Sequence, residues 1–211
     1  MVVSGRTYTN AIYSATNYGG VVKVSSNGYY GTGSLLYDGS AILTAAHLFT
    51  DTTSPTNVRF ELSDGSIQNI SASSVLIHPD YDTNNDNNDL AIVFLNNHAP
   101  NEVDRYDIYR ATDELTQNFT AVGYGVPGTG NVGEDQTVTE VERLKSTNTY
   151  DTLGDELKDA LGSIMAWDPL KKSVLVADFD DGSQAHDALG NLVNIKKYRY
   201  RYNRRIDFSW R

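Results

Sequence analysis

The stretch Gly33-Ser34-Leu35-Leu36-Tyr37-Asp38-Gly39-Ser40-Ala41-Ile42-Leu43-Thr44-Ala45-Ala46-His47 carries the strongest local signal in the chain. Two apolar, β-prone runs, residues 34–37 and 41–44, flank an Asp-Gly pair, and this arrangement indicates a β-hairpin. The second run leads to His47 through two alanines, whose small side chains leave room for the imidazole ring to face outward. The sequence therefore predicts a histidine at the end of a buried strand.

A histidine in this position has two interpretations. A lone histidine after an apolar run is most often a core or surface residue, but its pKa near neutrality also suits it to act as a base. Further along the chain, Asp89 stands at the mouth of the continuous apolar run 90–95. The presence of this second segment favours the second interpretation, because the two segments together support a resemblance.

These two segments resemble the histidine and aspartate motifs of the trypsin-like serine proteases, which have the chymotrypsin fold. The order, histidine before aspartate, is also that of the family. The resemblance implies that His47 is the general base and that Asp89 orients it. The segments that carry the likeness, over residues 2–126, are Val2-Val3-Ser4-Gly5, Leu43-Thr44-Ala45-Ala46-His47, His78-Pro79-Asp80-Tyr81, Asp89-Leu90-Ala91-Ile92-Val93 and Gly123-Tyr124-Gly125.

The chain contains no cysteine. Disulfides, thiolate catalysis and zinc-thiolate sites are therefore excluded, and packing and hydrogen bonds must stabilise the fold. Because animal trypsins brace their histidine loop with cysteines, the resemblance points to a bacterial-type member of the family. We expect no cofactor.

The nucleophile is not identified by the sequence. The family carries its serine in Gly-Asp-Ser-Gly-Gly-Pro, and no such hexapeptide occurs in these 211 residues. Ser183 stands at about the family's distance from Asp89, but it lacks the two following glycines that aim backbone amides at an oxyanion. A serine in the turn of an acidic loop is the simpler interpretation, and His186 is interpreted as a loop residue as well.

The resemblance implies a trypsin-like serine endopeptidase, which hydrolyses peptide bonds through a Ser-His-Asp triad. Since the serine segment is missing, we interpret this chain as truncated before it and inactive. The alternative is a non-catalytic binding or decoy protein that keeps the protease fold.

Short apolar runs separated by turn residues predict an all-β fold. With the resemblance, we expect two antiparallel six-stranded β-barrels of the trypsin-like type, the second one incomplete. We place the first barrel, with His47, Asp89 and the inter-barrel connection, in residues 1–117, a partial second barrel in 118–190, and a basic tail rich in Tyr and Arg in 191–211. Further strands are expected at 21–24, 58–62, 67–70 and 75–77, and a short amphipathic helix at 152–161.

Residues 80–88 place acidic or amide side chains at alternate positions, which is a feature of calcium-binding loops. The EF-hand pattern needs glycine at its sixth position and glutamate at its twelfth, where this chain has Asn85 and Ala91. We therefore interpret 80–88 as a solvated loop without a metal, and calcium stays the open alternative.

The net charge is −10, but 7 of the 17 basic residues lie in 191–211. The acidic body would repel nucleic acid and anionic lipid, and only the tail could attract them. No apolar run is long enough to span a membrane. The resemblance implies a protein or peptide substrate. We expect no membrane partner, the charge disfavours nucleic acid, and the oligomeric state is left open. The resemblance implies a secreted or periplasmic protein, although no signal peptide is visible.

Overall fold

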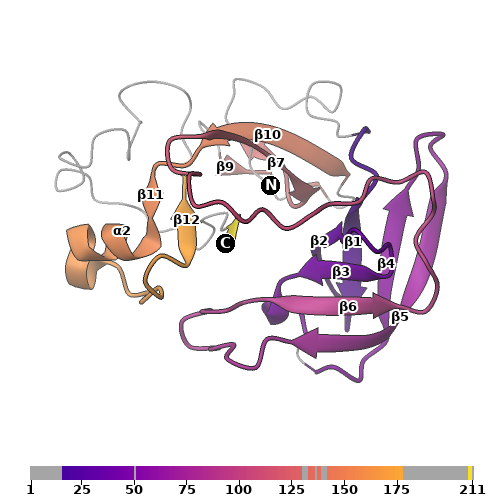
Figure 1. The fold of residues 1–211 in the computed structure, drawn as a ribbon, viewed down its shortest axis with the longest axis horizontal. Coiled ribbons are helices and arrows are strands. Elements are labelled where there is room, and N and C mark those ends of the chain that lie inside the picture. The colour runs from indigo at the N-terminus through magenta and orange to yellow at the C-terminus, as the bar shows by residue number, and fades with distance from the viewer. Residues whose placement is uncertain are drawn as a thin grey trace.

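The first half of the chain forms a closed six-stranded β-barrel in a computed structural model, which describes residues 16–49, 51–129, 133–135, 137–138, 142–177 and 209–210 (Figure 1). Neighbouring strands are antiparallel, and they close in the order β1-β2-β3-β6-β5-β4. Closure pairs both edges of the sheet and leaves none exposed. The strands are β1 (Val21–Ser26), β2 (Tyr29–Leu35), β3 (Ala41–Thr44), β4 (Thr56–Glu61), β5 (Ile67–Ile77) and β6 (Ala91–Leu95).

The core of the barrel is made by alternate side chains of its strands. Successive side chains of a strand point to opposite faces, so every second residue faces the interior. In β4, Thr56, Val58 and Phe60 are buried while the residues between them are not. The largest fully buried side chains of the barrel are Phe60, Leu35, Ile42, Val22, Val24, Val58 and Val93. This apolar interior gives β3 and β6 a fixed position.

The predicted Asp-Gly hairpin is present, but its turn is wider than expected. β2 ends at Leu35, so the expectation that the strand reaches residue 37 is wrong. The backbone N–H of Gly39 donates to Leu36, and the carboxylate of Asp38 accepts from Ser40 N at 3.0 Å. These local hydrogen bonds stabilise the turn, and Tyr37 is left exposed in it.

β5 is one strand of 11 residues, so the expected break between residues 70 and 75 is wrong. The first part of β5 pairs with β4 and the second part with β6. The register shifts between Ala72 and Ser74, which marks a β-bulge. A bulge bends a strand and increases its twist, and here it carries β5 from one neighbour to the other around the barrel.

The second half forms separate small sheets within the described part of the chain: β7 with β10, β8 with β9, and β11, β12 and β13 together (Figure 1). The expectation of an all-β fold with an incomplete second barrel is therefore confirmed for the described residues. No described helix has the length and apolarity needed to cross a membrane. The elements are β7 (Asn118–Tyr124), β8 (Gly128–Thr129), β9 (Gly133–Glu134), β10 (Arg143–Thr149), β11 (Thr152–Leu153), α2 (Gly154–Leu161), η2 (Gly162–Ile164), β12 (Val174–Val176) and β13 (Ser209–Trp210).

The expected helix at 152–161 begins later than predicted. Thr152 and Leu153 form β11 and pair with Val176 and Leu175 of β12, so α2 starts at Gly154. Sheet pairing with a strand more than twenty residues away has overridden the local helical pattern.

Polar contacts hold β7 and β10 against the barrel. The hydroxyl of Thr32 in β2 accepts from Tyr124 N at 2.9 Å. Gly123 is required there, because a Cβ atom at this position would lie 2.6 Å from Thr32 Oγ1. Arg143, only 4% exposed, donates from Nη1 to the carbonyl of Val21 at 3.0 Å. Gly123, the first glycine of the Gly-Tyr-Gly segment, thus allows β7 to lie close to β2 at the junction between the two halves.

We expect Gly33→Ala to destabilise the barrel by about 1–3 kcal/mol, the usual cost of overpacking a core. Gly33 is buried in β2, and a Cβ atom there would overlap Ile42 Cγ2 and lie 2.9 Å from Val24 Cγ2. The measurement is the midpoint of urea unfolding, monitored by circular dichroism.

The matched control is Gly31→Ala in the same strand, where a Cβ atom would lie at an ordinary 3.5 Å from Leu48. Equal midpoints for the two variants would show that the barrel interior is looser than these distances indicate.

Candidate active site

His47 lies in η1 (Ala46–Leu48), a single 3-10 turn that follows β3. Ala46 and Leu48 are buried on either side of it, whereas the His47 side chain is 64% exposed. The apolar neighbours anchor the turn in the core and leave the imidazole outside. The expected outward-facing histidine at the end of a buried strand is therefore present.

Asp89 lies two residues before β6, and its side chain is only 9% exposed. β3 and β6 are antiparallel neighbours, with Thr44 opposite Ala91. The chain leaving β3 and the chain arriving at β6 therefore meet at the same end of the barrel, and this brings His47 and Asp89 together.

The carboxylate of Asp89 makes two hydrogen bonds with His47. Oδ1 accepts from the backbone N–H at 2.7 Å, and Oδ2 lies 2.5 Å from the ring Nδ1. With the proton of a neutral imidazole on Nδ1 facing the carboxylate, Nε2 has a free lone pair that can accept a proton. The arrangement is that of a base whose tautomer is set by a buried acid.

The surroundings of the pair favour the protonated imidazole. The hydrogen bond to Asp89 is the main cause that raises the pKa of His47 above its ordinary value. Partial burial opposes this shift, while the charges of Asp89 and Asp86 add to it. The site can therefore stabilise the imidazolium that forms when His47 takes up a proton.

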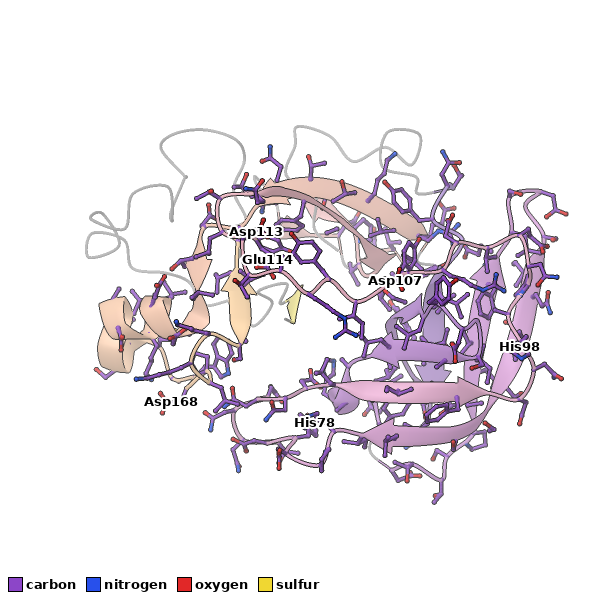
Figure 2. The ribbon with its side chains drawn as sticks, in the orientation of Figure 1. His78, His98, Asp107, Asp113, Glu114 and Asp168 are labelled. Carbon is purple, nitrogen blue, oxygen red and sulfur yellow. The ribbon has the colours of Figure 1, made fainter. Side chains whose placement is uncertain are left out.

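The sequence predicts that 80–88 is a solvated loop, but the structure shows that one of its side chains is buried. Asn87 is 6% exposed, and its side-chain amide donates to the carbonyl of Asp168 at 2.8 Å and accepts from Leu170 N at 3.0 Å. Figure 2 shows Asp168 in the second half, on the side where the loop that follows His78 extends toward it. Sequence reasoning missed Asn87, because nothing local separates it from the asparagines beside it.

An acidic side chain of the same loop accepts hydrogen bonds from other residues of the loop. The carboxylate of Asp82 accepts from Asn84 N at 2.9 Å and from Asn85 Nδ2 at 3.1 Å. In the part of the chain that the structure describes, no group of three or more His, Cys, Asp or Glu side chains is arranged to hold a metal ion.

The other candidates from the sequence lie outside the described residues. These are Ser183, His186 and the amino-terminal segment Val2-Val3-Ser4-Gly5. Of the candidate site residues, the structure thus brings His47 and Asp89 into contact, and Ser183, the candidate nucleophile, lies outside the described residues.

A family model for trypsin matches residues 7–158, which is most of the chain. The chain belongs to the trypsin family. The matched range includes His47 and Asp89, and Ser183 lies beyond it. No curated protein matches the chain significantly. Membership of this serine protease family agrees with the β-barrel and with the expected class of substrate, a protein or peptide.

We expect Asp89→Asn to lower the pKa of His47, because the main cause of its raised value is removed. A histidine with a raised pKa contributes stability that is complete below its unfolded pKa of about 6.5 and is lost as pH rises through the folded value. The loss of unfolding free energy in the variant should therefore be larger at about pH 6 than at about pH 9. Proton NMR titration of the ring and urea unfolding measure the two quantities.

The matched control is Asp80→Asn, since Asp80 is exposed in the same loop but is not among the charges that act on His47. An equal fall in the His47 pKa in both variants would contradict the assignment of the shift to the Asp89 hydrogen bond.

Proposed function

We propose that this chain carries the general base and the orienting carboxylate of a serine endopeptidase. The observation that supports this is the two-point contact of Asp89 with the ring and backbone of His47. Trypsin-family membership gives the reaction class. No cofactor is needed for this chemistry, because the side chains themselves move the proton.

In the proposed reaction, His47 Nε2 takes the proton of a serine hydroxyl as the serine oxygen attacks the peptide carbonyl. The tetrahedral intermediate collapses when His47 returns the proton to the leaving amine, and an acyl-enzyme forms. Water, deprotonated by the same nitrogen, then attacks the ester, and His47 returns that proton to the serine oxygen as the ester bond breaks and the acid product leaves. Asp89 holds the Nδ1 proton throughout and stabilises the imidazolium, which agrees with the raised pKa of His47.

We propose further that the polypeptide of residues 1–211 turns over peptide bonds little or not at all. The support is the absence of Gly-Asp-Ser-Gly-Gly-Pro from these residues. Removing the serine of such a triad typically lowers the rate by about 10⁶, and the amides that bind the oxyanion belong to the same segment.

The same absence favours a second candidate function, a non-catalytic protein that binds peptides with the protease fold. The barrel core and the exposed imidazole would persist in such a protein, because neither depends on the missing hexapeptide. The two candidates differ in whether a nucleophile is ever supplied to His47.

The sequence of the gene beyond the codon for Arg211, in all frames, tests the choice. If it encodes Gly-Asp-Ser-Gly-Gly-Pro, a protein that includes this segment should hydrolyse peptides, and His47→Ala should lower kcat by about 10⁶. If no such segment is encoded and the chain binds peptides without cleaving them, the binding function is correct. Full activity of His47→Ala in the extended protein would refute the assignment of the base.

For residues 1–211, we expect no labelling of Ser183 by a fluorophosphonate probe, because the flanking sequence lacks the glycines that build an oxyanion site. Residual hydrolysis of a peptide ester should be the same in the unmodified chain and in Ser183→Ala. Mass spectrometry and a spectrophotometric assay measure the two outcomes.

An active trypsin-family enzyme serves as the positive control for the probe. A covalent adduct on Ser183 that disappears in Ser183→Ala would show that this chain has its own nucleophile and that its proposed inactivity is wrong.

A further inference from the structure

The loop that precedes Asp89 is tied to the second half of the chain by two asparagines. Asn87 makes the two amide hydrogen bonds described above, to the carbonyl of Asp168 and from the N–H of Leu170. Asn85 accepts from the indole Nε1 of Trp167 at its carbonyl and from Asp168 N at its side chain, the latter at 3.3 Å. Four hydrogen bonds thus join residues 85–87 to residues 167–170, and we call this contact the asparagine tie.

The second-half side of the asparagine tie is itself well anchored. Lys158 of α2 donates to the carbonyl of Met165 at 2.7 Å and forms a salt bridge with Asp168 at 3.2 Å. Met165 is 3% exposed and packs with Leu157 and Val176 in a small apolar cluster. Residues 165–170 therefore present their backbone groups to the loop from a fixed position.

The path from Asn87 to Asp89 is short and stiff. One residue separates them, Asn88, whose φ of 55° lies in the left-handed region that non-glycine residues rarely adopt. Asn88 is held by its side chain, which donates to the carbonyl of Asp80 at 3.0 Å, and its carbonyl accepts from Leu90 N at 2.7 Å. A displacement of Asn87 must therefore reach the carboxylate of Asp89.

Asp89 tolerates little displacement, since it makes two hydrogen bonds with a single partner, at 2.7 and 2.5 Å. Catalytic groups need to be held within about 0.5 Å of their productive geometry. Asn87 is also the buried member of the loop, and a buried amide without partners would be costly. Within the described residues, both of its side-chain polar atoms are satisfied by the second half.

We propose that Asn87 is a positioning residue, which fixes the orientation of Asp89 toward His47 by tying the loop to residues 168–170. The His47–Asp89 pair, although built entirely on the first barrel, then depends on the second half for its geometry. The catalytic consequence of this tie rests on the proposed function, whereas the contact and its effect on the pair do not.

The test compares Asn87→Ala with Asn84→Ala in the chain of residues 1–211. Asn84 lies in the same loop, is exposed, and its side chain bonds only to Asp82 in the described structure. The readout is the far-downfield proton NMR signal of His47 Nδ1–H, which depends on its hydrogen bond to Asp89. We expect this signal to be lost or strongly broadened in Asn87→Ala and kept in Asn84→Ala.

A loss of stability alone should not move this signal. Gly33→Ala, which strains the barrel core away from the asparagine tie, should therefore keep it. An unchanged signal in folded Asn87→Ala, or its loss in both Asn84→Ala and Gly33→Ala, would overturn the proposal.

If Asn87→Ala does not fold, Trp167→Phe provides the second variant, because it removes the indole donor of the asparagine tie and keeps an aromatic ring. We expect the His47 signal to broaden in this variant, and an unchanged signal would overturn the proposal. The readout requires no hydrolysis, so failure of the endopeptidase assignment would appear in the gene and probe experiments and leave this result intact.

Discussion

The antiparallel pairing of β3 with β6 is the constraint on which the candidate site depends. Thr44 lies opposite Ala91, so the residues just beyond each strand share one end of the barrel. The pairing is stable because both strands also contribute to the apolar interior, through Ile42 and Val93 among others. His47 and Asp89 are far apart in the sequence, and the strand pairing itself brings them into contact.

The chemistry of the pair follows from unequal burial. The Asp89 carboxylate is nearly inaccessible, whereas most of the His47 side chain faces solvent. An acid that is withdrawn from water but fully hydrogen-bonded orients the imidazole without competing for the incoming proton. The exposed part of the ring is then accessible to a substrate or a nucleophile, and the proposed endopeptidase mechanism requires this division of roles.

The second half contacts the barrel at separate places, and each contact uses polar atoms. Thr32 and Tyr124 join β2 to β7, and Arg143 of β10 reaches the carbonyl of Val21. The asparagine tie joins residues 85–87 to residues 167–170. Since directional hydrogen bonds take part in these junctions, small changes at them can alter geometry at the site without unfolding the barrel.

The sequence by itself determined that the chain is rich in short strands, that an Asp-Gly hairpin precedes His47 and that His47 and Asp89 are the motif residues, because these follow from local alternation, turn chemistry and short motifs. The tertiary structure decided the bulge that makes β5 continuous, the start of α2 and the role of Asn87. Each of these depends on a partner distant along the chain: β6 for the bulge, β12 for Thr152, and residues 168–170 for Asn87. Local sequence specifies what a segment can form, and only the folded chain specifies which distant hydrogen-bond partners it meets.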